Sequence, residues 1–274
     1  MKRAFTLLEM VVVIALIALM THLAVRELDR LVDHKKDAAA DAQLESIKAA
    51  VYHETAGAEP GGFLADMGRL PRLAEPDGRA SGVVTNGTLA ELWLLPEGAD
   101  EYRLKEAVGS NLCAGVSAKA GVWVPTGWRG PYVKLPIGKS RLCDAWGNAF
   151  ESDDYSGLER LSSTGGVITA VSHYGATARR ENRREVSLIP DRGAESSLFV
   201  SIESAGSGAG TVEVAWYGPS SGLVTGAVES AAYPGQVRFT GLTPGRRVVF
   251  DSVTGASRFV DLKPGENTYI LKLP

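Results

Sequence analysis

The hydrophobic pattern divides the chain into one long helical stretch, a mixed middle region and a C-terminal region of short alternating runs. The first stretch is the most pronounced. Residues 5–25 read FTLLEMVVVIALIALMTHLAV, and Glu9 is the one Asp, Glu, Lys or Arg among them. As a helix this run is about 31 Å long, enough to cross the hydrocarbon core of a bilayer. Lys2 and Arg3 precede it, and the positive-inside rule then keeps the N-terminus in the cytoplasm.

The helical pattern continues past the apolar run but becomes amphipathic. No Pro or Gly occurs from position 5 to 56, and Gly57 is a typical stop signal, so we expect the helix to end just before Gly57. Such a helix is roughly 78 Å long. We therefore expect its first half to meet lipid or other subunits and its second half to carry a globular head. The apolar positions of the second half fall close to one face: Leu28, Leu31, Val32, Leu44, Ile47 and Val51.

Two ordinary interpretations of the N-terminal run are a secretory signal peptide and a plain signal anchor. Against the first, no small-x-small cleavage site follows the run, and a carboxylate lies inside it. Against the second, an acidic residue in a membrane segment costs up to a few kcal/mol and is by default a functional hypothesis. Glu9 is therefore the first candidate functional residue.

The C-terminal region, from about Glu195, changes to short runs of β-branched and aromatic residues at regular spacing. Gly, Pro and Ser separate many of these runs, and seven of them in the last 80 residues predict a β-sandwich. The runs are SSLFVSIES, GTVEVAWYG, GLVTGAVES, GQVRFTGL, RRVVFDS, SRFVDL and NTYILKL. Alternation predicts inward side chains for three groups of residues: Val212, Val214 and Trp216; Val237 and Phe239; Val248 and Phe250.

The middle region, residues 58–194, mixes short apolar runs with Gly, Pro and Asn. The segment 89–98 has the composition of a short helix, and strands are expected at 149–153, at 166–172 and near 185–189. With the flanking regions, this predicts an α+β protein. A long N-terminal helix packs on a small antiparallel sheet and is followed by an all-β sandwich.

Composition and charge mainly exclude classes of function. The near-neutral balance of 29 basic and 32 acidic residues argues against nucleic-acid binding, which usually shows as a basic excess. Two cysteines are too few for a disulfide scaffold or a four-thiolate zinc site. There is no H-E-x-x-H and no P-loop, and the four histidines are far apart. We therefore expect no metal site, no cofactor and no enzymatic activity.

The N-terminal residues KRAFTLLEM resemble the prepilin leader and cleavage site of type IV pilins and type II secretion pseudopilins. The resemblance implies a leader at residues 1–4, cleavage between Ala4 and Phe5 by a membrane prepilin peptidase, and N-methylation of Phe5. It also implies that Glu9 pairs with the Phe5 amine of a neighbouring subunit during assembly. Each charge is costly alone in an apolar bundle and tolerable when paired. Ala4 stands where the family usually has Gly.

Two further segments resemble known families. Gly130, Pro131 and Tyr132, followed by a D-x-W-G-N turn, resemble the head of the major type II secretion pseudopilin. The turn residues are Asp144, Trp146, Gly147 and Asn148, and we interpret them as structural. The segment VRFTGLTPGRRVV resembles transthyretin-like and carboxypeptidase-regulatory-like sandwiches, with Arg247 or Val248 near the place of that pattern's aromatic residue. An immunoglobulin-like sandwich is the nearest alternative.

Two questions about the head are whether a late loop binds calcium and whether the two cysteines form a disulfide. Related heads commonly bind calcium in a late loop, but here that loop, residues 175–187, carries four arginines against two glutamates. A hard dication needs oxygen ligands and negative charge, so we expect no calcium site. Cys113 and Cys143 both follow the membrane segment and would face an oxidising compartment. A bridge between them is therefore possible, worth roughly 3 to 4 kcal/mol on the chain-entropy model.

The sequence thus predicts five segments: a leader (1–4), a transmembrane assembly helix (5–25), its amphipathic continuation (26–57), a pseudopilin-like head (58–194) and a β-sandwich (195–274). The first hypothesis is a minor or specialised pilin-like subunit. It is anchored in the inner membrane with a periplasmic head, then assembled into a periplasmic or extracellular filament. Its expected partners are prepilin peptidase, other pilin-like subunits, the inner-membrane assembly platform and membrane lipid. The alternatives are a membrane-anchored receptor or adhesin without a filament, and a periplasmic hydrolase.

Overall fold

A computed structural model describes residues 7–54, 58–71, 89–111, 117–143, 145, 169–172, 184–187, 195–203, 208–218 and 223–273. The helices are α1 (Leu7–Val51) and α2 (Phe63–Met67), with short 3-10 turns η1 (Ala90–Leu92) and η2 (Gly109–Asn111). The strands are β1 (Arg103–Glu106), β2 (Trp123–Thr126), β3 (Thr169–Ser172), β4 (Arg184–Ser187), β5 (Ser196–Glu203), β6 (Gly208–Gly218), β7 (Leu223–Tyr233), β8 (Gly235–Leu242), β9 (Gly245–Asp251), β10 (Ser257–Leu262) and β11 (Gly265–Lys272). The predicted α+β class is confirmed.

The long helix α1 ends earlier than the sequence predicts. It stops at Val51 rather than just before Gly57 because the next residues enter another pairing. The backbones of His53 and Gly61 exchange two hydrogen bonds of 3.0 Å. The His53 ring Nδ1 also lies 3.0 Å from the carbonyl O of Ala49. A β-bridge and a side-chain cap thus replace the last predicted turn.

The head packs on the C-terminal part of α1. Leu44, Ile47 and Val51 are buried there, as the amphipathic pattern predicts, together with Phe63 and Met67 of α2. The segment expected to form a short helix contains η1, whose Ala90 and Leu92 are buried. Strands β3 and β4 pair antiparallel with each other and contact α1, in agreement with two of the three strands expected in the head. The third, 149–153, lies outside the described residues.

Each of the seven C-terminal runs forms a strand, and the strands form two sheets. One sheet has the order β10-β9-β6-β7 and the other the order β11-β5-β8. The pairs are antiparallel except β11 with β5, which are parallel over Gly265–Lys272. Side chains of both sheets share one core: Leu198, Val200 and Ile202 of β5, Val212 and Val214 of β6, Val237, Phe239 and Leu242 of β8, Val249 of β9, Val260 and Leu262 of β10, and Leu271 of β11.

One inward pair in the sandwich was predicted wrongly. Val249, not Val248 and Phe250, faces the shared core. Val248 and Phe250 lie on the outer face of the four-stranded sheet and are nevertheless buried. The antiparallel hairpin β1–β2 covers them, and Val124 of that hairpin joins their cluster. Alternation could not predict this, because β9 is buried on both faces.

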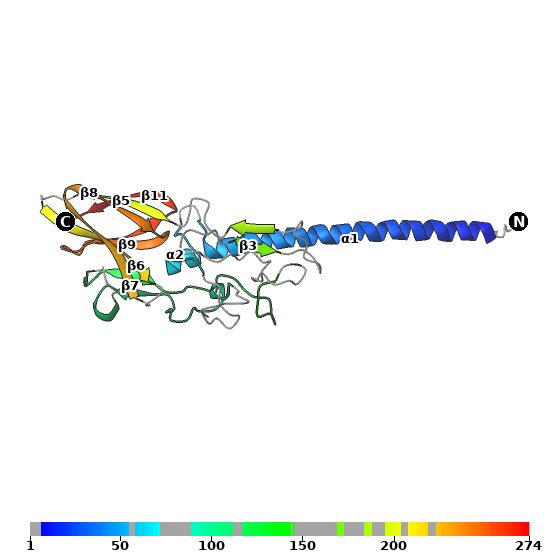
Figure 1. The fold of residues 1–274 in the computed structure, drawn as a ribbon, viewed down its shortest axis with the longest axis horizontal. Coiled ribbons are helices and arrows are strands. Elements are labelled where there is room, and N and C mark those ends of the chain that lie inside the picture. The colour runs from blue at the N-terminus through cyan, green and yellow to red at the C-terminus, as the bar shows by residue number, and fades with distance from the viewer. Residues whose placement is uncertain are drawn as a thin grey trace.

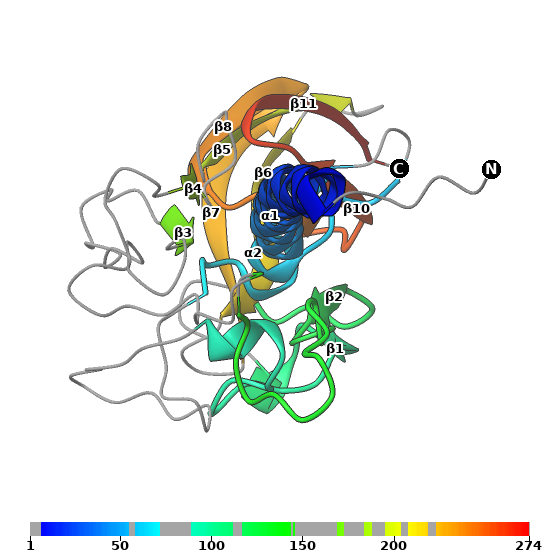
Figure 2. The same cartoon turned by 90° about the vertical axis from the view of Figure 1, so that its right-hand side faces the viewer.

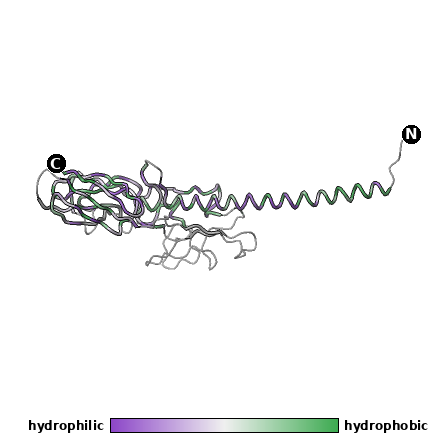
Figure 3. The backbone as a smooth tube through the Cα atoms, turned by 90° about the horizontal axis from the view of Figure 1, so that it is seen from above, coloured by the Kyte–Doolittle hydropathy of each residue, from purple (hydrophilic) through white to green (hydrophobic). Residues whose placement is uncertain are grey.

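The molecule is elongated. Helix α1 projects alone toward the N-terminus, and the sandwich lies beyond its other end with the C-terminus (Figure 1). The projecting half of α1 is largely apolar, and polar positions become frequent toward the head (Figure 3). The hairpin β1–β2 and the sandwich lie against each other at the far end, so the head and the sandwich are packed side by side.

Candidate functional sites: the projecting helix and the head–sandwich joint

The first candidate site is the projecting half of α1. Glu9 lies in its first turn, and α1 is long and apolar enough to cross a membrane. Its large apolar side chains are about half exposed or more: Leu7, Leu8, Met10, Val11, Val12, Ile14, Leu16, Ile17, Leu19, Met20, Leu23, Leu28 and Leu31. An apolar surface of this extent is stable only against lipid or against other apolar helices.

Farther along the helix, Leu28, Leu31 and Val32 are exposed although they share the predicted apolar face with buried Leu44. The head covers only the part of that face near the C-terminal end of α1. The apolar stripe therefore continues from the head toward the membrane segment, as a surface on which neighbouring helices can pack.

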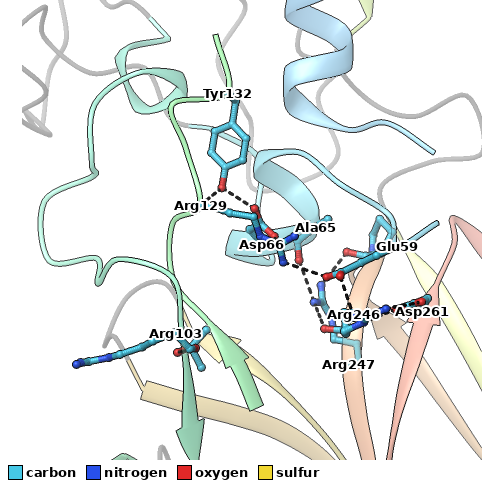
Figure 4. A network of polar contacts seen from close by, with 11 residues as sticks. Glu59, Ala65, Asp66, Arg103, Arg129, Tyr132, Arg246, Arg247 and Asp261 are labelled. Atoms are coloured by element: carbon cyan, nitrogen blue, oxygen red, sulfur yellow. Dashed lines mark hydrogen bonds and ion pairs between the residues drawn. The ribbon is translucent and has the colours of Figure 1, made fainter. Parts of the chain in front are cut away.

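The second candidate site is a polar joint between the head and the sandwich (Figure 4). Its centre is Asp66 of α2, whose side chain is 5% exposed. The hydroxyl of Tyr132 donates to Asp66 Oδ2 at 2.8 Å, and the backbone N–H of Arg129 donates to that hydroxyl at 3.0 Å. The Arg129 guanidinium lies 3.3 Å from Asp66 Oδ1. Burial raises the pKa of Asp66 to about 6, against the opposing effects of Arg129 and Tyr132.

From Asp66 a chain of ion pairs leads into the sandwich. Arg129 is also 3.0 Å from Glu59, and the second oxygen of Glu59 is 2.8 Å from Arg246 of β9. Arg246 donates two hydrogen bonds, of 2.7 and 3.0 Å, to Asp261 of β10. Alternating charges therefore link α2, the loop before it and two strands of the sandwich.

Arg247 forms the buried part of the joint. Its residue is 2% exposed, and its Nη1 donates to the carbonyl O of Ala65 in α2 at 3.0 Å. Its Nη2 donates to Pro244 O and Thr243 Oγ1 at 2.7 and 2.8 Å. Burial lowers the pKa of Arg247 to about 10, and the nearby Asp66 opposes that shift, so the guanidinium stays charged at neutral pH.

The aromatic side chains of the head support this joint. Tyr132 makes edge contacts with Phe63 and Trp128, with ring centroids 5.8 and 5.9 Å apart. The indole N–H of Trp128 donates to Glu91 O at 2.9 Å. Glu91 in turn holds Arg69 in a bidentate ion pair of 2.6 and 2.7 Å. This packing holds the ring of Tyr132, the tyrosine of the Gly-Pro-Tyr motif, in the position from which its hydroxyl donates to Asp66.

Comparison with known proteins concerns the first site. Residues 1–25 match the family model described as the prokaryotic N-terminal methylation motif. The matched residues run into the apolar helix that carries Glu9. The N-terminal segment is therefore type IV pilin-like. No curated protein matches it.

For a pilin-like chain the expected processing residues are Ala4 and Phe5, and both precede the described residues. Glu9 is described, but its pairing with a neighbour stays a prediction. The motif implies processing by prepilin peptidase and assembly with other pilin subunits. It therefore supports these two kinds of partner without identifying a particular protein. The apolar helix near the N-terminus fits a membrane-anchored, single-pass protein.

The other predicted site residues of the pilin-like chain remain untested. The turn residues Asp144, Trp146, Gly147 and Asn148 lie outside the described residues, as does the arginine-rich loop except for Arg184–Ser187. Cys143 is half-buried and is a free cysteine in the structure, with its Sγ 3.8 Å from Arg141 O. Cys113 lies outside the described residues, so the bridge stays a prediction. Within the described part of the chain, His, Cys, Asp and Glu form no group suited to a metal ion.

Sequence reasoning missed the joint almost entirely. Asp66, Glu59 and Arg129 occur in loops or short helices with no pattern that brings them together. One signal was available: Arg247 stands near the aromatic position of the sandwich motif. The structure gives the reason for that departure, because the side chain at this position reaches the carbonyl O of Ala65 in the head.

Proposed function

We propose that the protein is a structural subunit, minor or specialised, of a type II secretion pseudopilus or a type IV pilus. Before assembly it is anchored in the inner membrane with its head in the periplasm, and the assembly platform then adds it to the filament. The observation that carries the proposal is the methylation motif on residues 1–25, joined to an exposed apolar helix with a carboxylate in its first turn.

The chemistry of this segment accounts for assembly. Cleavage after Ala4 creates an amine at Phe5, four residues before Glu9, and four residues are about one helical turn. In lipid each charge requires a partner. The carboxylate of one subunit and the amine of the next satisfy each other only at one axial offset, and that offset sets the register of the incoming helix.

The pilin-like family is structural and non-enzymatic, and the hydrolase alternative has little support. Residues 218–222, GPSSG, match G-x-S-x-G by letter. That motif needs a strand–turn–helix elbow to expose its serine. Here it connects β6 to β7, two antiparallel strands of one sheet.

Two measurements test the proposal. Intact-mass and N-terminal analysis of protein from the native membrane is expected to show loss of residues 1–4 and a methylated Phe5. In Glu9→Ala, membrane insertion is expected to persist while recovery in sheared filaments falls at least tenfold; Glu27→Ala, an exposed carboxylate on the same helix, is the matched control. An intact Met1, or Glu9→Ala filaments at wild-type yield, would refute the proposal and favour a receptor or adhesin.

A further inference from the structure

A turn of the head presents an isoleucine between two lysines. The N–H of Lys139 donates to the carbonyl O of Pro136 at 3.0 Å and closes the turn, and Gly138 has φ +77°, as the third position of a type II turn requires. Ile137, at the tip, is fully exposed. Lys134 and Lys139 are also exposed, and within the described part of the chain neither side chain forms an ion pair or a hydrogen bond.

We call Lys134, Ile137 and Lys139 the basic turn. No Asp or Glu occurs in the sequence from position 107 to 143, so nothing near it along the chain offsets its charge. Val133, just before the turn, packs in the cluster that contains Leu44 of α1. Seen along α1, the green segment that contains the turn lies to one side of the helix, together with the β1–β2 hairpin (Figure 2). The basic turn therefore faces outward beside the last part of α1.

Nearer the membrane, α1 has an exposed surface of opposite charge, which we call the acidic face. It consists of Leu28, Asp29, Val32 and Asp33, all exposed. Residues three and four apart are neighbours on a helix, so Val32 lies beside both Leu28 and Asp29. Asp29 and Asp33 are four apart, a spacing at which like charges destabilise a helix. Neither aspartate forms an ion pair with any residue that the structure describes, so a cation from outside would relieve their repulsion.

The two surfaces are complementary in charge and in apolar area, but they do not meet within one chain, where both stay exposed. Leu28 and Leu44 are 16 positions apart, or roughly 24 Å along the helix. A parallel copy displaced by that length toward the C-terminal end of α1 brings its acidic face level with the basic turn. Pairing of Glu9 with the amine of a neighbour displaces copies in the same direction, by one turn or about 6 Å. The copy that meets the basic turn is therefore about four such steps away.

We propose that the basic turn of one copy of this chain docks on the acidic face of a second copy. The tip residue Ile137 then packs on Leu28 and Val32, and the two lysines face the two aspartates. The inference rests on the proposed function, because it requires parallel copies that are displaced along α1. The contact joins two different surfaces of the same chain, so it continues from copy to copy and does not close as a dimer. It points to a specialised subunit that occurs in several copies within contact of one another.

Cross-linking between two single-cysteine chains tests the contact. One full-length chain carries Ile137→Cys and the other Val32→Cys, each with its own epitope and with both native cysteines replaced by serine. The two chains are co-expressed, and sheared filaments are oxidised with copper phenanthroline. We expect a disulfide-linked dimer that carries both epitopes, and no dimer from either variant alone. Arg30→Cys, exposed on the opposite side of α1 from Val32, is the matched control for Val32→Cys and should not cross-link.

Three outcomes would overturn the inference while leaving the subunit proposal intact. The first is a link that forms inside a chain carrying both cysteines but never between two chains. The second is a link from Ile137→Cys to a different subunit, identified by peptide mass spectrometry. The third is no link at all in filaments that contain both variants. Filaments that lack the chain altogether would instead refute the subunit proposal, and this inference with it.

Charge reversal tests the ionic part of the contact. Lys134→Glu with Lys139→Glu is expected to lower recovery of the chain in sheared filaments roughly tenfold, because like charges then face each other. Asp29→Lys with Asp33→Lys should do the same. All four substitutions together restore opposite charges and should return recovery to within about threefold of wild type. Arg258→Glu, which reverses an exposed cation of the sandwich, is the control, and membrane insertion is measured for every variant. Loss without restoration would mean that the turn contacts something else, anionic lipid included, and would overturn the inference.

Discussion

The buried carboxylate at the joint gives a pH dependence whose sign and size follow from the structure. Burial raises the pKa of Asp66 from about 3.8 to about 6. Between these values the folded state binds a proton that the unfolded state does not. The resulting stability is fully present below pH 3.8 and is lost as the pH rises through 6. Between pH 5 and pH 7.5 the change is about 1.4 kcal/mol, or tenfold in the unfolding equilibrium.

Other charged groups lie around Asp66, and the experiment must separate their contribution to the pH dependence of stability from that of Asp66. Arg247 faces it from β9, Arg129 follows β2, Glu59 precedes α2, and the hydroxyl of Tyr132 donates to it. Glu213 lies on β6, which also packs against α2. Each of these charged neighbours is a carboxylate or a guanidinium, and the pKa of Asp66 itself is raised into the range from pH 5 to 7.5.

The assay compares the full chain with Asp66→Asn in non-denaturing detergent, using urea unfolding followed by tryptophan fluorescence. The amide oxygen still accepts from Tyr132, so the substitution removes the titration and retains the hydrogen bond. We expect the wild type to gain about 1.4 kcal/mol more than Asp66→Asn on acidification from pH 7.5 to 5. Glu97→Gln, on an exposed loop residue, is the matched control and should behave as wild type. Equal pH dependence of the wild type and Asp66→Asn would refute the argument, as would a carboxyl carbon NMR titration of Asp66 with its midpoint near 4.

Two further substitutions test the packing, and one chemical treatment tests the disulfide. Gly245→Ala should lower the free energy of unfolding by at least about 2 kcal/mol more than Gly265→Ala. Both positions have positive φ, but only at Gly245 would the added Cβ overlap the carbonyl O of Ala65. Equal losses of stability in urea unfolding would contradict this contact. Phe250→Ala should cost about 3 to 5 kcal/mol although it lies on the outer face of its sheet, and a cost below about 1 kcal/mol would mean that the hairpin does not cover it in solution. Alkylation without reductant should leave Cys113 and Cys143 unmodified if they are bridged, and mass spectrometry showing two added groups would exclude the disulfide.

The sequence predicted elements better than it predicted how they pack together. The seven C-terminal strands, the buried face of α1 at Leu44 and Ile47, and the apolar segment with Glu9 all follow from periodicity and spacing, which are local properties. The end of α1 was missed by five residues because a long-range bridge between His53 and Gly61 decides it. The inward side of β9 was missed because a strand buried on both faces has no alternation. The joint was missed because Asp66 and Arg247 are 181 positions apart, and no local pattern links them.

The double burial of β9 also bears on how such a chain can be divided or recombined. Composition changes at about Glu195, which suggests that the sandwich could be excised there as an independent module. Yet a fragment that starts at Glu195 would carry Val248 and Phe250 into water on its outer face, and would leave the Arg247 guanidinium without its partner in α2. The physical boundary of the sandwich therefore includes the hairpin of residues 103–126. Transfer of this module to another pilin scaffold requires that hairpin to go with it.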